Sequence, residues 1–132
     1  MLSSAEVEYL KSQRLARVAT VSTEGEPEVS PVAFEFDGSF FWIGSHEQSI
    51  FFKTRRYKNV KSGNNRVCLV VDDLASVDPW RPRGIKVWGT CEIIEHVGFF
   101  GEGSYLRITP QVSISWGIEA INKGRWASKK RH

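Results

Sequence analysis

The sequence lacks the features of a membrane protein and of a disulfide-bonded secreted protein. No apolar run approaches the roughly 20 residues of a membrane-spanning helix, and the first residues contain neither the basic nor the apolar segment of a secretion signal. Only two cysteines occur, Cys68 and Cys91, and each lies in an apolar, strand-like run that is typical of a buried, reduced thiol. We therefore expect a cytoplasmic protein with no membrane partner.

The motifs of several large enzyme classes are also missing. The chain contains no Gly-x-Gly-x-x-Gly dinucleotide fingerprint, no P-loop, no His-Glu-x-x-His zinc motif and no Gly-x-Ser-x-Gly nucleophile elbow. Its three histidines are scattered, and one of them is the last residue. No metal centre or catalytic triad is expected, and no side chain is singled out as catalytic. An enzyme with this sequence would therefore depend on a cofactor for its chemistry.

Basic residues are concentrated in two segments. Of the 18 lysines and arginines, six lie in KTRRYKNVKSGNNR, residues 53–66, and five lie in KGRWASKKRH, residues 123–132. All 15 acidic residues lie elsewhere, so the rest of the chain is acidic although the pI is about 9.0. A focused basic patch suits a small anion, such as a phosphate, better than a long polyanion, which is bound along a stripe.

The basic stretch has the periodicity of a short helix. Thr54 stands at the N-cap position and Gly63 stands just past the helix end. The N-terminus of such a helix, surrounded by arginines and lysines, offers charge-assisted hydrogen bonds to a phosphate. Two other interpretations stay open at this point. The cations could only keep an exposed helix soluble, or the patch and the tail could bind nucleic acid, with Tyr57 or Trp126 stacking on the bases.

A second helix is predicted at the N-terminus, where Ser3 and Glu6 form a capping box and the helix continues to about Gln13. Most of the remaining chain has the patterns of β-strands. The run RVCLVVDD, residues 66–73, is almost continuously apolar, so we expect it to be buried on both faces, inside a barrel or against a second subunit. Gly89 interrupts a long strand and is a predicted β-bulge.

Loops are expected at residues 74–84, which contain two prolines, and at residues 96–104, and Pro110 is expected to separate two short strands. The segments between strands are too short for crossover helices, so the sheet should be antiparallel. Hairpin turns and a glycine-kinked strand favour a closed barrel over a sandwich. We predict one mainly β domain over residues 1–122, with an N-terminal helix and one short helix between strands. Residues 123–132 are predicted to be a flexible basic tail.

Four segments of the chain together resemble the split-barrel family that includes pyridoxamine 5′-phosphate oxidase and the related flavin- and deazaflavin-dependent oxidoreductases. They are LARVATVSTEGEPEVSPVAFEFDG, TRRYKNVKSGNNRVCLVVDD, DPWRPRGIKVWGTCEII and RITPQVSISWG, which together span Leu15 to Gly117. The last two are most similar to the branch that uses the deazaflavin coenzyme F420. The resemblance implies an antiparallel split β-barrel that forms a homodimer, with its cofactor sites at the subunit interface.

The resemblance also implies three groups of cofactor-binding residues. The first follows a strand along the isoalloxazine-type ring, largely through its backbone: Ser30, Pro31 and Val32. The second holds the phosphate at the end of a strand and on the basic helix: Gly44, Ser45, Lys53, Thr54, Arg56 and Lys58, with Arg55 as a substitute for Arg56. The third covers the ring from the partner chain: Trp80, Arg81 and Arg83 of the proline-rich loop, or Trp116.

The implied function is that of an oxidoreductase dependent on F420 or FMN, which transfers hydride or electrons between the cofactor and a small, electron-poor organic substrate. Two departures from the family pattern matter. The turn after the basic helix reads Asn64-Asn65-Arg66-Val67 where relatives commonly have Asn-Pro-Arg-Val. The Arg-x-His motif that binds the substrate phosphate in the vitamin B6 oxidases is absent, so pyridoxamine 5′-phosphate oxidation is not expected. The alternatives are a cofactor carrier without turnover and a small barrel that binds nucleic acid.

Overall fold

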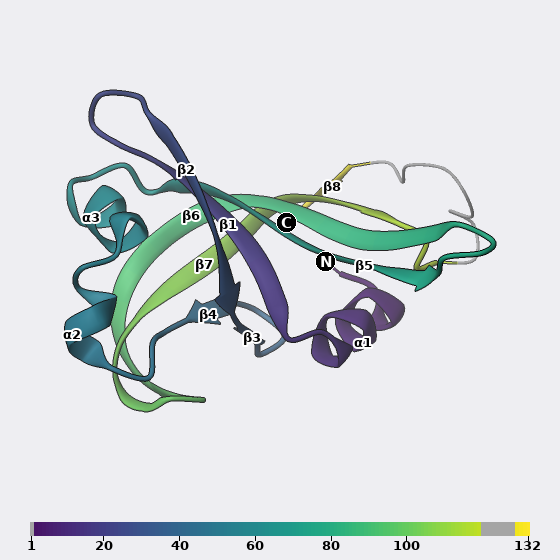
Figure 1. The fold of residues 1–132 in the computed structure, drawn as a ribbon, viewed down its shortest axis with the longest axis horizontal. Coiled ribbons are helices and arrows are strands. Elements are labelled where there is room, and N and C mark those ends of the chain that lie inside the picture. Colours follow the sequence, from purple (N-terminus) through teal and green to yellow (C-terminus); the bar gives the residue numbers. More distant parts are fainter. Residues whose placement is uncertain (1, 120–128) are drawn as a thin grey trace.

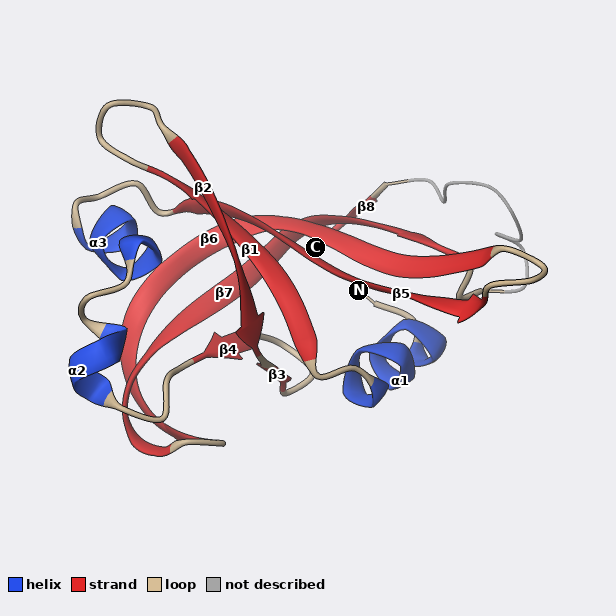
Figure 2. Ribbon diagram, viewed as in Figure 1, coloured by secondary structure: helices blue, strands red, loops and turns tan. Residues whose placement is uncertain are grey.

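The structure is a computed structural model that describes residues 2–119 and 129–132. Within these residues an antiparallel sheet is accompanied by short helices (Figures 1 and 2). The helices are α1 (Ser4–Ser12), α2 (Gln48–Phe51) and α3 (Arg55–Lys61). The strands are β1 (Leu15–Val21), β2 (Pro27–Ala33), β3 (Glu35–Phe36), β4 (Phe41–Ile43), β5 (Arg66–Ser76), β6 (Arg81–Gly98), β7 (Gly101–Trp116) and β8 (Lys130–Arg131).

The sheet is strongly curved (Figure 1). Its strand order is β2-β1-β5-β6-β7-β4-β3, with β8 added to β7, and every pairing is antiparallel. The two ends of this order, β2 and β3, are consecutive in the chain and are separated only by Phe34. One nearly continuous segment therefore runs from one edge of the sheet to the other (Figure 1). This arrangement confirms the predicted antiparallel split barrel.

Alternate residues of the long strands fill one hydrophobic core, as the period of a β-strand requires. Strand β5 buries Val67, Leu69 and Val71, and the neighbouring β6 buries Ile85 and Val87. Within the single chain the run at residues 66–73 is therefore buried on one face, and its other face stays half-exposed.

Both predicted helices are confirmed, and their caps explain their positions. In α1 the Ser3 side chain accepts the Glu6 N–H while the Glu6 side chain accepts the Ser3 N–H, which is the predicted capping box. In α3 the N-cap is Thr54, and Gly63 follows the last turn with a φ of 110°, a conformation that glycine adopts without strain. The single-turn helix α2 was not predicted, and its N-cap Glu47 makes no side-chain capping bond.

The predicted bulge at Gly89 is confirmed, but the predicted loops and the break at Pro110 are wrong. Trp88 pairs with Val112 and Gly89 pairs with Pro110, so one residue of β7 is left over at the bulge. A bulge tolerates proline, because the ladder is interrupted there anyway. Strands β5 and β6 extend through most of residues 74–84, and β6 and β7 through most of residues 96–104, which leaves two tight hairpins.

The end of the basic tail is part of the fold. Lys130 and Arg131 form β8 and pair with Ser113 and Val112 of β7. The ammonium group of Lys130 lies 2.7 Å from a carboxylate oxygen of Glu6, whose side chain is only 1% exposed. The prediction of a flexible tail is therefore wrong for residues 129–132, because strand pairing and an ion pair fix them. Residues 123–128 lie outside the described residues.

We expect Lys130→Met to lower the free energy of unfolding by about 2 kcal/mol at neutral pH, because it leaves the buried Glu6 carboxylate without its cation. Burial raises the pKa of Glu6, but hydrogen bonds from Lys130 and the Ser3 amide outweigh burial and hold the pKa below its usual value. A group with a lowered folded-state pKa contributes stability above its unfolded pKa and loses that contribution as the pH falls through its folded pKa. The deficit of the variant should therefore shrink as the pH falls below about 4.

Urea unfolding of the wild type and the variant at neutral and at acidic pH measures this difference. Arg131→Met is the matched control, because Arg131 lies next to Lys130 on β8 and is exposed. The control should change the free energy of unfolding by less than about 0.5 kcal/mol. Equal losses in both variants at neutral pH would contradict the role of the ion pair.

Candidate cofactor-binding site

Helix α3 holds the basic part of the candidate site. Its N-cap, Thr54, accepts the backbone N–H of Tyr57 at 3.3 Å, so the first turn begins directly after the cap. Arg56 is half-buried in this first turn. The remaining cations predicted to bind phosphate are exposed: Lys53, Arg55 and Lys58. Arg56 is therefore the cation that the fold fixes most firmly.

Arg56 of α3 lies within electrostatic range of Glu28, a carboxylate on β2. Burial lowers the pKa of the Arg56 guanidinium, and the nearby Glu28 carboxylate opposes that shift. Ser30, two residues along β2, donates its hydroxyl to one carboxylate oxygen of Glu28. Within the described residues, Arg56 Nε and the other oxygen of Glu28 are buried and have no hydrogen-bond partner.

Whether a phosphate fits this site can be judged from Arg56 Nε, a buried donor without an acceptor among the described residues. A buried N–H group without an acceptor costs roughly 1–3 kcal/mol, so native proteins seldom leave one unsatisfied. A phosphate oxygen is a strong acceptor for a guanidinium N–H. The residues present therefore fit a phosphate group, with Arg56 as its donor.

The predicted ring-binding segment of β2 begins two residues after Glu28. Ser30 is half-buried, Pro31 is exposed, and the Val32 side chain belongs to the core, with 5% of its surface exposed. Because the side chain of Val32 is committed to the core, this residue can approach a ligand only through its backbone. The predicted backbone contact stays a prediction.

Gly44 and Ser45 follow β4 and are half-buried. A Cβ atom on Gly44 would lie 2.4 Å from Cε2 of the Tyr105 ring, so only glycine allows this aromatic packing. Tyr105 donates its hydroxyl to the carbonyl oxygen of Gly101 at 2.7 Å and accepts the Phe100 N–H at 3.0 Å. Gly44 thus has a structural role beside any role in binding.

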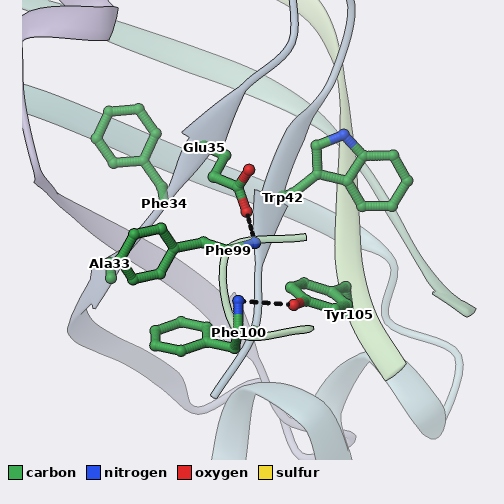
Figure 3. Close-up of a pocket in the computed structure, with 8 residues that line it drawn as sticks. Ala33, Phe34, Glu35, Trp42, Phe99, Phe100 and Tyr105 are labelled. Carbon is green, nitrogen blue, oxygen red and sulfur yellow. Dashed lines mark hydrogen bonds between the residues drawn. The ribbon is translucent and has the colours of Figure 1, made fainter. Parts of the chain in front are cut away.

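Gly44 also lines a small hollow. Figure 3 shows the aromatic side chains around this hollow. Its volume is about 190 Å³ including the open mouth, and its lining comes from β2–β4 and the β6–β7 hairpin: Ala33, Phe34, Glu35, Trp42, Gly44, Phe99, Phe100 and Tyr105. Glu35 accepts the backbone N–H of Phe99, which holds the hairpin tip over the hollow. Pockets for organic ligands usually measure about 300–1,000 Å³, so this hollow does not accommodate a tricyclic ring.

The residues predicted to cover the ring lie at the other end of the molecule. Trp80 is 67% exposed in the β5–β6 hairpin, which Figure 1 shows at the end of the molecule opposite α3. Arg83 binds Asp73 through two hydrogen bonds of 2.8 Å, and its guanidinium lies over the ring of Tyr9. Trp116 packs on Gly84 of β6. Within one chain, these residues do not meet the basic helix.

Arg83 is held by a hydrogen-bonded network that fixes α1 to the β5–β6 hairpin. The Tyr9 hydroxyl donates to Asp73 at 2.9 Å, and burial together with this carboxylate raises the pKa of Tyr9 well above its ordinary value. The hydrogen bonds from Arg83 lower the pKa of Asp73. Tyr9 is therefore a neutral structural donor in the physiological range, and Arg83 has a defined position at the surface.

Activated nucleophiles and metal ligands are not found in the described part of the chain. Burial raises the pKa of the Cys91 thiol to about 12 and also raises that of Cys68, so neither thiol forms a thiolate readily. The described residues contain no group of three or more His, Cys, Asp and Glu side chains placed to hold a metal ion. Among these same residues, no helix is long and apolar enough to cross a membrane.

Sequence reasoning missed Glu28 and the aromatic hollow. Glu28 follows two other acidic residues, Glu24 and Glu26, and such a run is typical of a solvated turn. Its spacing of two residues from Ser30 on a strand was the available signal, since it places both side chains on one face. The hollow had no local signal, because segments distant in sequence line it.

Comparisons with known proteins agree with this fold. The model of the family described as pyridoxamine 5′-phosphate oxidase matches residues 2–114. A curated relative from Streptomyces rimosus subsp. rimosus, a 5a,11a-dehydrotetracycline/5a,11a-dehydrooxytetracycline reductase, is 34% identical over 118 residues, which is 86% of this chain and 82% of that protein.

Solved structures of low sequence identity share the fold. A conserved hypothetical protein from Mycobacterium tuberculosis matches with a TM-score of 0.69 at 18% identity, over 97% of this chain and 92% of the other. A structure described as an F420 reductase matches with a TM-score of 0.64 at 18% identity, over 85% of this chain and 98% of the other. A heme-binding protein from Mycobacterium smegmatis matches with a TM-score of 0.71 at 17% identity, over 99% of this chain but only 59% of the other. At these identities the likeness concerns the fold alone.

Proposed function

Because the chain belongs to the pyridoxamine 5′-phosphate oxidase family, we propose that it is an oxidoreductase that uses a flavin-type cofactor, F420 or FMN, to act on a small, electron-poor organic substrate. The observation that carries this proposal is the half-buried Arg56, whose Nε has no acceptor among the residues that the structure describes. The relative that is a reductase of dehydrotetracyclines supports redox chemistry as the activity.

The phosphate of the cofactor binds at α3. Arg56 donates to it from a half-buried position, while Lys53, Arg55 and Lys58 add positive charge from exposed positions. Thr54 caps the helix and thereby fixes the direction of the first-turn N–H groups. Gly44 and Ser45 directly follow β4 and contact the phosphate. The ring lies along the edge strand β2 and contacts the backbone of Ser30, Pro31 and Val32.

The cofactor supplies the hydride or electrons, so the chain needs no nucleophile of its own. Its residues bind the phosphate, orient the ring and keep water from its face. The two free cysteines also agree with a reducing cytoplasm as the place of action.

A homodimer completes the site in this proposal. The outer face of β5, β6 and β7 carries half-exposed apolar side chains that alternate with the core: Cys68, Val70, Trp88, Val112 and Ile114. A second copy seated on this face would cover it and would bring Trp80, Arg83 and Trp116 of one subunit toward α3 of the other. The small volume of the hollow in one chain agrees with a ring site that needs two chains.

The experiment is a binding and turnover assay on the purified chain. We expect a mass in solution of about twice the 15.0 kDa of one chain, measured by light scattering, and saturable binding of F420 or FMN, measured by fluorescence. Reduced cofactor should then be oxidised by a panel of quinones and enones faster than in free solution. Binding without turnover would indicate a carrier, and the absence of binding to either cofactor would refute the proposal.

A further inference from the structure

Glu28 places a negative charge beside the cation that binds the phosphate. Glu28 pairs with Thr20 of β1, and the Thr20 hydroxyl accepts a hydrogen bond of 2.9 Å from Asn59 of α3, so the strand position of Glu28 lies beside the helix that carries Arg56. At this position the carboxylate acts electrostatically on Arg56, although the two side chains form no ion pair in the described part of the chain. One carboxylate oxygen accepts the Ser30 hydroxyl, and the other is buried without a partner. The half-buried part of the site therefore contains one fixed positive and one fixed negative charge.

The negative charge of Glu28 weakens the binding of phosphate groups to an extent that depends on their own charge. A phosphate monoester carries between 1.5 and 2 negative charges near neutral pH, as a rough value, whereas a phosphodiester carries one. Because Coulomb repulsion is proportional to charge, a fixed carboxylate repels the monoester up to twice as strongly as the diester. FMN ends in a monoester, and the phosphate of F420 is a diester because the lactyl-polyglutamate tail continues from it.

We propose that Glu28 is a specificity-determining residue that biases the site toward a phosphodiester cofactor such as F420 and against a monoester such as FMN. The inference rests on the proposed function and names the cofactor class for the same site. Glu28 lies on β2 two residues before Ser30 and Pro31, so its charge is fixed by the strand and cannot move away with a loop.

The competing role is purely structural. A carboxylate that only orients Arg56 would help both phosphates equally, and its loss would weaken both. The charge role predicts the opposite sign, because removing the carboxylate should strengthen both and should strengthen the monoester more. The two roles therefore differ in the direction of the effect as well as in its size.

The test is Glu28→Gln, which removes the charge and keeps an acceptor for Ser30. Two pairs of ligands are compared, and within each pair the ring is the same and only the phosphate differs. The monoesters are FMN and the deazaflavin 5′-phosphate, and the diesters are their monomethyl esters. Fluorescence titration gives the dissociation constants. We expect the variant to bind the diester about 5-fold and the monoester about 25-fold more tightly, so the ratio of the two constants changes about 5-fold.

Glu26→Gln is the matched control. Glu26 is exposed in the turn before β2, and its loss changes the net charge by the same amount. The control should change the ratio of the two constants by less than about 2-fold, because solvent screens exposed charges. An unchanged ratio in Glu28→Gln, or weaker binding of both esters, would overturn the inference while the proposed function stands. Failure of the folded wild type and variant to bind any of the four ligands would overturn this inference, and failure to bind F420 as well would refute the proposed function.

Discussion

The substitution Arg56→Ala should weaken cofactor binding about 10- to 150-fold, which corresponds to the roughly 1.5–3 kcal/mol of a hydrogen bond to a charged group. Arg56 is half-buried on α3, so its guanidinium is more fixed in position than the exposed cations around it. Its Nε is a buried donor without an acceptor among the described residues. A phosphate that accepts from this nitrogen removes an unsatisfied group and gains a charge-assisted bond.

The fold should tolerate this substitution. A buried N–H group without a partner costs free energy, so its removal should leave the melting temperature unchanged or slightly higher. Lys61→Ala is the matched control, because Lys61 lies on the same helix but in its exposed last turn. Titration of F420 and FMN should give a change of less than about 2-fold for this control. Equal losses of affinity in both variants would show that the patch acts only through its total charge.

Arg56→Lys and Lys58→Ala separate charge from geometry. Lysine keeps the positive charge but loses the planar fork of arginine, so Arg56→Lys should bind more tightly than Arg56→Ala and less tightly than the wild type. Lys58 is exposed, so Lys58→Ala should cost less than Arg56→Ala. Titrations of the three variants under one buffer condition test this order. A larger loss of affinity in Lys58→Ala than in Arg56→Ala would indicate that the phosphate binds at Lys58 and not at Arg56.

Local signals account for the parts of the fold that the sequence predicted. Both helix starts depend on short-range hydrogen bonds, from Ser3 and Glu6 in α1 and from Thr54 in α3, and such bonds are visible as residue patterns. The loop at residues 74–84 was mispredicted because its prolines were taken as strand breakers. Pro82 pairs with Leu74 of β5, but it has no partner on β7, because the pairing of β7 with β6 begins at Gly84. On the β7 side the missing N–H of Pro82 therefore costs no hydrogen bond.

The site depends on contacts that no local pattern contains. The basic helix was predicted as a phosphate patch, but the ranking of its cations follows from burial, which separates Arg56 from its exposed neighbours. Glu28 became part of the site only through β1, because Thr20 pairs with Glu28 and accepts a hydrogen bond from Asn59 of α3. The tail residue Lys130 similarly gained its role from Glu6, 124 positions earlier in the chain. The fold brings such charged partners together from distant parts of the chain. The sequence therefore identifies the charged residues but not the residues with which they interact.

The substitution Gly89→Ala should lower the free energy of unfolding by about 3 kcal/mol or more, the upper range for forcing extra volume into a packed interior. A Cβ atom at this position would lie 2.3 Å from the carbonyl oxygen of Thr109 and 3.1 Å from its carbonyl carbon. Both are backbone atoms of β7, so no side-chain rotation can relieve the clash. Relief would require β6 and β7 to separate at the bulge where the long ribbon bends.

Gly103→Ala is the control that isolates this backbone clash. Its Cβ would approach the side-chain amide of Gln48 at 2.7 Å, and that side chain can rotate away, although it would give up hydrogen bonds to Ser104. Thermal melts followed by circular dichroism should show a loss of about 10 °C or more for Gly89→Ala and a clearly smaller loss for Gly103→Ala. Similar melting temperatures for Gly89→Ala and the wild type would mean that the bulge can open without cost. In that case the bend of the β6–β7 ribbon would follow from Pro110 and the extra residue of β7, and glycine would not be required.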